Sequence, residues 1–431
     1  MFSGRHGLFT IAVASLSVAF QACGSAGDET GGLGSAWTAT TDTIGDTIRV
    51  FTEHGQIWES NAHLVSEISI GVLDGEPQYQ FGNIRAIAVG ADGRMYVLDG
   101  HGPVLRMYAA DGTWVQNVGR EGEGPGEYKQ PDSGLAMRPD GKLLLRDPGN
   151  GRISIYDSGV YEGSWPLTGG LNTSSPMVVT RDGATLTLVI KNLGTSVMEW
   201  QRGLARYHLD GTTDTLDIPD LGYEEAIISG ESEGSSSTNN VPYTPEQQYT
   251  YSPLGYFITG ISEDYSFKLL HEDGPVIEIG RDYEPVPVMA DEASIQRRQI
   301  TQNFRDNFPG WSWNGPPIPD IKPPYSDLLT SEGGRIWVRV HAESQRYLSA
   351  EDQRAEETRL ERPVNPYREP IVFEVFEPTG EYLGRVETPP GFTVYPRPII
   401  RDMTVWGVIR DELDVARLHR FRVDFSMTNG D

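Results

Sequence analysis

The stretch NIRAIAVGADGRMYVLDGHGPVLRMYAADG, residues 83–112, is repeated 48 positions later over residues 131–160. A period of this size is typical of a supersecondary unit that stacks on copies of itself. The same offset also relates the segments that precede the two copies, so that Ile70-Gly71 falls on Val118-Gly119. The positions that match within the two units are Asp92-Gly93 with Asp140-Gly141, Asp99 with Asp147, and Tyr108 with Tyr156.

Each unit has the pattern of a four-stranded antiparallel meander. IRAIAV, RMYVLD, VLRMYAA and TWVQNVG have the composition of short strands, and Asp-Gly pairs stand at two of the turns between them. Aspartate-glycine favours tight hairpins because both central residues need a positive φ, which glycine adopts freely and aspartate tolerates. The sequence therefore predicts one small sheet per unit.

Weaker copies extend this pattern along the chain to a total of six units. They cover residues 178–219, 250–281, 328–389 and 401–425. The last copy ends on a third strand, whereas HLVSEISIG at 63–71 has the pattern of a fourth strand with no strands before it. Pairing the two would remove the sheet edges that otherwise invite aggregation. We expect an all-β chain whose ring of six four-stranded blades is closed by this N-terminal strand.

The paired units also resemble a known family. A-D-G-R-x-Y-V-x-D, R-M-Y-A-A-D-G and V-G-R-E-G-E-G-P-G-E-Y look like NHL-type repeats of the six-bladed β-propellers that many bacteria export, often as lipoproteins. The resemblance is tight over residues 64–166 and looser up to residue 425. Because much of that family lacks an assigned activity, the resemblance implies the fold rather than the function.

Composition excludes some partners. The 431 residues include 35 basic and 61 acidic side chains, a formal charge of -26, which repels nucleic acid and anionic lipid. We expect no nucleic-acid partner and a monomer. The 49 glycines and 29 prolines fit many short strands joined by turns.

The N-terminus has the plan of an export signal. LFTIAVASLSVAF, residues 8–20, is apolar but short for a membrane span, and small residues follow it. FQAC resembles a bacterial lipobox, which implies a signal over residues 1–22 and lipidation at Cys23, followed by a flexible tether over residues 23–45 and a propeller over residues 46–428. The alternative is ordinary cleavage after Ala26. We expect an exported protein, periplasmic or on the outer surface, held to a membrane only by its lipid.

The run NVGREGEGPGEYKQP, residues 117–131, is glycine-rich without being a phosphate loop. Gly119 and Gly124 have the spacing of such a loop, but Pro125 and Gly126 stand where its lysine and hydroxyl belong. We interpret the run as the connector between two blades, with its glutamates on the rim of the central channel.

Three insertions lengthen the pattern on that same rim, over residues 220–248, 282–323 and 341–370. The second one predicts a short amphipathic helix that begins at Asp291, with Ile300, Phe304 and Phe308 spaced along one face. The aromatic and basic residues on these loops could line a groove for a sugar, peptide or acidic ligand, or could pack the insertions onto the propeller. These residues are Trp311, Trp313, Tyr325, Tyr347, Tyr367, Arg297, Arg298, Arg339, Arg346 and Arg354.

Topology places the candidate ligand-binding residues on the proposed rim. Asp99 and Asp147 could contribute carboxylates to a calcium site, or could instead hydrogen-bond the neighbouring loop. No other cofactor is expected. The full set of candidates is Asp99, His101, Arg120, Glu121, Glu123, Tyr128, Asp147, Asn150, Arg339, His341, Arg346 and Tyr347.

No catalytic motif stands out. The sequence has neither H-E-x-x-H nor a G-x-S-x-G nucleophile elbow. We therefore expect a non-catalytic module that binds a ligand, glycan, peptide or protein outside the cytoplasm. The alternative is a metal-assisted lactonase, hydrolase or lyase with its site at the mouth of the channel.

Overall fold

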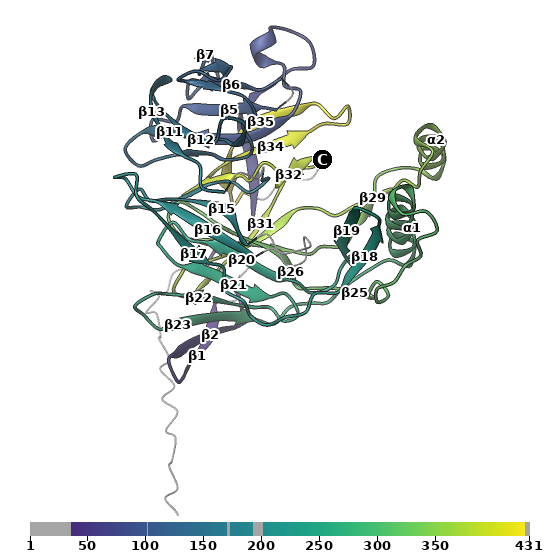
Figure 1. Cartoon of the computed structure of the whole chain (residues 1–431). Coiled ribbons are helices and arrows are strands. Elements are labelled where there is room, and N and C mark those ends of the chain that lie inside the picture. The colour runs from purple at the N-terminus through teal and green to yellow at the C-terminus, as the bar shows by residue number, and fades with distance from the viewer. Residues whose placement is uncertain (1–35, 101, 170–172, 193–200, 427–431) are drawn as a thin grey trace, which may run out of the picture.

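The computed structural model describes residues 36–100, 102–169, 173–192 and 201–426 (Figure 1). This part of the chain is nearly all β-structure, with two helices, α1 (Ala290–Asn307) and α2 (Ala350–Leu360). Most strands form four-stranded antiparallel groups stacked around a common centre, and the helices lie in a lobe to one side.

The double repeat forms the two most regular sheets, as the sequence predicts. Each is an antiparallel meander in chain order, and Gly93 and Gly141 take the positive φ that their hairpin turns require (82° and 83°). The first sheet consists of β4 (Ile84–Val89), β5 (Met95–Asp99), β6 (Val104–Tyr108) and β7 (Trp114–Asn117). The second consists of β10 (Leu135–Met137), β11 (Lys142–Asp147), β12 (Arg152–Asp157) and β13 (Val160–Pro166).

The third and fourth groups follow the weaker copies. The third is β14 (Val178–Val179), β15 (Thr185–Asn192), β16 (Gln201–Tyr207) and β17 (Thr213–Asp217). The fourth is β20 (Gln247–Tyr251), β21 (Phe257–Ile261), β22 (Ser266–Leu270) and β23 (Val276–Arg281).

A hairpin from the N-terminal segment extends the fourth sheet at its outer edge. β2 (Thr47–His54) pairs in parallel with β23, and β1 (Thr38–Ile44) pairs with β2. The expected flexible tether over residues 23–45 is therefore wrong for residues 38–44. These residues are polar but rich in threonine, which is β-branched and suits an exposed strand stabilised by backbone pairing.

The fifth and sixth groups share the remaining N-terminal strand. β3 (Ala62–Ile70) runs antiparallel to β35, from His63 opposite Asp424 to Ile70 opposite Leu418, and its first residues also pair with β31. The fifth group is β26 (Tyr325–Thr330), β27 (Ile336–Val340), β30 (Val372–Phe376) and β31 (Tyr382–Glu387). The sixth is β32 (Phe392–Thr393), β33 (Ile399–Arg401), β34 (Thr404–Arg410) and β35 (Ala416–Asp424).

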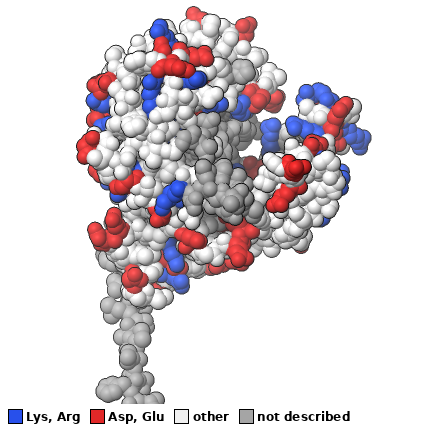
Figure 2. All heavy atoms as spheres, viewed as in Figure 1, with Lys and Arg blue, Asp and Glu red and all other residues white. Residues whose placement is uncertain are grey.

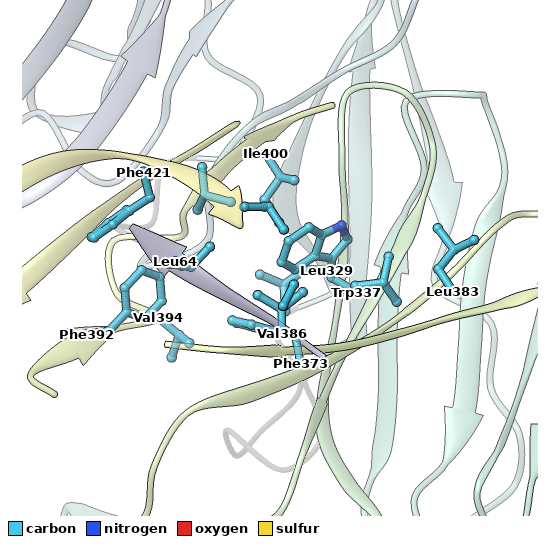
Figure 3. Packing of buried hydrophobic residues seen from close by; sticks show 14 residues of the cluster. Leu64, Leu329, Trp337, Phe373, Leu383, Val386, Phe392, Val394, Ile400 and Phe421 are labelled. Carbon is cyan, nitrogen blue, oxygen red and sulfur yellow. The ribbon is translucent and has the colours of Figure 1, made fainter. Parts of the chain in front are cut away.

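Apolar packing holds β3 in place. Leu64 lies in a buried cluster with Phe421 of β35, Trp337 of β27 and Val386 of β31, so one strand joins the cores of two sheets (Figure 3). Burying a leucine of this kind contributes on the order of 2 kcal/mol. Residues separated by more than 300 positions are thus held against each other.

The first strands of the groups line a common centre. β33 contacts β4, β4 contacts β10, β10 contacts β14, and β20 contacts β26. Radially placed four-stranded sheets with their first strands innermost are the arrangement of a β-propeller.

The three insertions form a separate lobe. α1 begins next to the expected Asp291, and its Phe304 and Phe308 pack with Ile228 and Val241 in a small core of the lobe's own. α2 was not expected within 341–370, since none of its residues is buried and it therefore has no apolar face to detect. The short strands of the lobe are β18 (Ile227–Ser232), β19 (Ser235–Asn240), β24 (Val286–Pro287), β25 (Ile321–Lys322), β28 (Gln345–Arg346) and β29 (Tyr367–Arg368).

Candidate functional site

A cavity of about 1310 Å³ lies where the first strands meet. Its walls contain residues of β4, β10, β14, β20, β26 and β33, so every one of the six groups contributes to it. Ligand pockets in proteins commonly have volumes of roughly 300 to 1,000 Å³, and this cavity exceeds them. It has room for a ligand of several rings.

The lobe stands at one end of this cavity. The insertions precede β20, precede β26 and follow β27, and the start of β26 lies beside the end of β27 because Tyr325 is opposite Val340. We call the end of the cavity where β4, β20 and β26 begin the lobe end. Figure 2 shows the lobe beside the body, separated from the upper body by an open notch.

Arginine dominates the charge of the cavity. Its described lining residues include seven arginines and three carboxylates, although the whole chain has a formal charge of -26. The arginines are Arg85, Arg138, Arg181, Arg339, Arg397, Arg401 and Arg410, and the acidic residues are Glu246, Asp327 and Glu332. The cavity therefore departs in sign from the rest of the molecule.

Four of these arginines are paired with carboxylates that neutralise them. Arg397 contacts Asp327 at 3.0 Å and Arg401 contacts Glu332 at 2.6 Å. Arg138 and Arg410 form ion pairs with the acidic side chains of Asp140 and Asp414. Arg401 also donates to the carbonyls of Val89 and Gly90, so it ties the sixth sheet to the first. We interpret these four arginines as structural.

The other three arginines carry the excess charge. Arg85 donates to the carbonyl of Pro131 at 2.9 Å and Arg181 to the carbonyl of Gly333 at 3.0 Å. Arg339 lies on β27 opposite Asp327, and its guanidinium makes no hydrogen bond or ion pair with any other described residue. Since a guanidinium carries five N–H donors, Arg339 offers a full set to the cavity.

Three tyrosines, Tyr249, Tyr251 and Tyr395, add aromatic surface to the lining. Tyr395 is 61% exposed, which is unusual for so large an apolar ring, and Tyr249 lies on β20. Burial raises the pKa of Tyr249, although the charges of Arg202 and Arg397 oppose the rise, so its hydroxyl stays protonated at neutral pH. The lining thus combines cationic donors with flat aromatic faces.

Asp99 and Asp147 each bind the backbone of an adjoining connector. The carboxylate of Asp147 accepts the amides of Lys129 and Gln130 at 2.9 Å, and Asp99 accepts those of Gly82 and Asn83 at 3.0 Å. Both side chains are buried, at 3% and 0% exposure. This geometry fits the expectation that the repeated aspartates hydrogen-bond the neighbouring loop, which is the alternative to a calcium site. In the fourth group the hydroxyl of Ser262 accepts the amide of Glu246 in a similar way.

The glycine-rich connector folds on itself. β8 (Arg120–Glu121) pairs in parallel with β9 (Glu127–Tyr128), and a Cβ on Gly119 would come within 2.5 Å of the carbonyl of Gly126, so the crossing requires glycine. The candidate residues here bind within the connector or the adjacent sheets. Arg120 pairs with Glu127, Glu123 with Lys129, Asn150 with the carbonyl of Gly122, and the Tyr128 hydroxyl with the amide of Leu105, while Glu121 is exposed.

The remaining candidates lie in or beside the lobe. Arg346 donates to Gln353 and Tyr347 donates to the carbonyl of Asn365, both within the third insertion. His341 lies 2.8 Å from Glu369. His101 and Cys23 lie outside the described residues. Among the candidate ligand-binding residues that the structure describes, only Arg339 lines the cavity.

The aromatic residues of the insertions pack within the protein. Trp311 and Trp313 lie against the lobe core, and the ring of Trp311 stacks on Phe304 at 4.5 Å. Tyr325 is fully buried, and its hydroxyl donates to the carbonyl of Ser266. These three aromatic residues therefore pack within the protein, as the second alternative for them expects, and do not line a groove for a ligand.

A buried polar junction joins the three insertions. Tyr243 and Ser344 donate to Glu292 at 2.6 and 2.7 Å, and Lys322 binds Glu369 at 2.9 Å. Burial opposes the ionisation of Glu369, but the hydrogen bond and charge of His341, the charge of Lys322 and the amide of Ala342 outweigh it and lower its pKa to about 2. Sequence patterns missed this junction because its members are scattered over more than a hundred positions.

No group of three or more His, Cys, Asp or Glu side chains in the described part of the chain could hold a metal ion. None of the described helices is long and apolar enough to cross a membrane.

Comparison with known proteins supports the fold. No family model and no curated protein matches the chain. A DUF4221 family member from Bacteroides vulgatus is similar in structure, with a TM-score of 0.50 and 10% identity over 85% of this chain and 99% of that one. A Bacteroides fragilis protein that is named as an exported protein has a TM-score of 0.44 and 11% sequence identity. The match covers 88% of this chain and 99% of that one. A virginiamycin B lyase from Staphylococcus aureus has a TM-score of 0.36 and 11% sequence identity, over 90% of this chain and 100% of that one. At these identities the likeness concerns the fold alone.

Proposed function

We propose that this protein is an exported, lipid-anchored six-bladed β-propeller with NHL-type repeats, closed by β3, that binds a ligand without chemical conversion in its central cavity. The observation that carries this function is the cavity itself, which has a volume of about 1310 Å³ and is lined by all six groups of strands. A large concave site in which polar side chains converge is the usual form of a small-molecule binding site.

The position of the lobe supports the same proposal. Its three segments enter at the lobe end of the cavity, so a ligand in the cavity would lie near residues of the lobe. Long loops on a rigid scaffold are the usual place for binding residues because the scaffold fixes their position. The lobe would then limit which ligands reach the cavity.

Export and anchoring rest on the N-terminal sequence. The apolar stretch at 8–20 and Cys23 in FQAC have the pattern of a lipoprotein signal. Replacing Cys23 with serine should release the exported protein from the membrane fraction. A Cys23→Ser variant that still partitions with membranes after export would contradict the anchor.

Filling the cavity tests the binding function. Ser326 and Thr250 are small lining residues on β26 and β20, and a tryptophan at either position would occupy part of the space. Ligands found in a thermal-shift screen of residues 24–431 should stabilise the parent protein and fail to stabilise Ser326→Trp and Thr250→Trp. Circular dichroism would verify that both variants are folded. Undiminished binding by both folded variants would place the site elsewhere and overturn the proposal.

A further inference from the structure

We infer that the cavity recognises an acidic oligosaccharide, with the guanidinium of Arg339 binding a carboxylate of the sugar. This inference rests on the proposed binding function and gives its ligand a chemical class. It follows from three properties of the lobe end: its charge, its aromatic surface and its size.

Ion pairs within the protein neutralise part of the charge at the lobe end, and the remaining groups decide its sign. At the lobe end, the carboxylate of Asp327 is occupied by Arg397, and Arg410 by Asp414. Arg339 and Arg85 remain without a carboxylate partner among the described residues, whereas Glu246 is the one acidic side chain there outside an ion pair. Two guanidinium groups against one carboxylate favour an anion, and a planar guanidinium matches the two oxygens of a carboxylate.

The position of Arg339 makes it the principal contact. It lies on a strand in the middle of the fifth sheet, between β26 and β30, so its backbone is rigidly held. The residue opposite Arg339 on β26 is Asp327, whose carboxylate forms an ion pair with Arg397 at 3.0 Å. The guanidinium of Arg339 makes no hydrogen bond or ion pair with the described protein, and the strand that carries it is rigid. Such a group is pre-organised to bind a ligand.

Aromatic faces and amides favour a sugar over a bare anion. Tyr395 and Tyr249 line the same cavity, and the C–H faces of sugar rings pack against aromatic rings whose polar tips stay hydrogen-bonded. Gln248 and Asn83 add side-chain amides to the lining, and beyond their hydrogen bonds to Glu246 and Arg410 they keep an acceptor oxygen and a donor nitrogen for hydroxyl groups. A cavity of about 1310 Å³ also exceeds what inorganic phosphate or a single sugar needs.

The test is a calorimetric titration of the full mature chain with tetragalacturonate and with its neutral methyl ester. We expect the acid to bind and the ester to bind at least roughly tenfold more weakly, with the affinity for the acid falling as salt is raised. Arg339→Gln should weaken binding of the acid by roughly ten- to a hundredfold and leave binding of the ester unchanged, because only the charged contact is lost. Arg339→Lys should recover part of the affinity.

Controls separate this inference from the proposed function. Arg362→Gln removes the same charge from an exposed position just after α2 and should leave the affinity unchanged. Equal binding of acid and ester, abolished by Ser326→Trp, would keep the cavity as the site and overturn the acidic class. Stronger binding of tetraglutamate or of inorganic phosphate than of the uronate would likewise overturn the saccharide assignment. An Arg339→Gln variant as tight as the parent for the acid would overturn the role of Arg339.

Discussion

The first two sheets and the lobe are built by opposite means. In residues 84–166 one solution is used twice: Asp99 and Asp147 each accept two amides of an adjoining connector, and each Asp-Gly turn has the same geometry. The lobe has no repeat, and unlike residues from three insertions meet at Glu292 and Glu369. Because its pattern is repeated, the first region can be predicted from the sequence. The lobe cannot, because its contacts join residues that are far apart in the chain.

The cavity lies in the body, where the first strands of all six groups meet, and the lobe stands at one end of it. Its walls are the regular first strands, but the guanidinium of Arg339 on β27 makes no hydrogen bond or ion pair with another described residue. The following experiments separate the two regions, from the largest expected effect to the smallest.

Deleting residues 46–75 should abolish cooperative folding. The deletion removes β3, so the edge of β35 and the cluster around Phe421 and Trp337 would be exposed to solvent. We expect no thermal transition in calorimetry. Deleting residues 24–45 instead removes β1 and Trp37, which packs at the edge of a core cluster, and should preserve the transition with a modest loss in Tm. A 46–75 deletion that melts cooperatively at the parent temperature would refute the closure by β3.

Replacing Lys322 by methionine should open the lobe and spare the body. Lys322 has a fully buried ammonium, and its loss leaves the carboxylate of Glu369 without that partner, which costs about 3–5 kcal/mol for a buried pair. Hydrogen exchange should accelerate in α1 and α2 and stay unchanged over residues 84–166. Lys142→Met, which removes an exposed ion pair with Glu162, is the matched control and should change little. Equal acceleration in both regions would show that they unfold as one unit.

Asp147→Ala should destabilise the body as a whole. Two amides, those of Lys129 and Gln130, would lose their acceptor in a buried position, at a cost of about 2–3 kcal/mol. Denaturant unfolding should show this loss, and Asp99→Ala should reproduce it in the first sheet. Asp157→Ala at an exposed strand end serves as the control. A Tm that rises with calcium in the parent but not in Asp147→Ala would instead favour the metal alternative for these aspartates.

The seam between β3 and β35 should have a modest dependence on pH. His419 lies 2.8 Å from Ser66 and 3.3 Å from Ser69, and burial together with the charge of Arg417 lowers its pKa from 6.5 to about 4. Because the unfolded chain binds the proton more readily, this contribution to stability is complete above pH 6.5 and is lost as the pH falls towards 4. His419→Gln should flatten the pH dependence of Tm in this window, whereas His54→Gln at an exposed site should not. Identical profiles for parent and His419→Gln would contradict this pKa.

The sequence allowed the all-β architecture, the four-stranded units and the helix near Asp291 to be predicted, because each depends on local periodicity or turn chemistry. The added strand over 38–44 was missed because backbone pairing with β2, not an apolar pattern, holds it. The candidate site was harder to predict. Arg339 was among the candidates, but Arg85, Arg397 and Tyr249 were not, since each lies on the first strand or at its start in a different sheet and only the three-dimensional arrangement brings them to one cavity.

We propose that the ligand site of this protein lies in the cavity of the body and not on the loops of the lobe. A crystal structure of the protein with bound tetragalacturonate tests it most directly. We predict a sugar chain among the first strands, with a carboxylate within hydrogen-bonding distance of the Arg339 guanidinium and a ring against Tyr395 or Tyr249. A sugar bound instead to Arg346 and Tyr347 on the lobe, with the cavity filled only by solvent, would contradict the account.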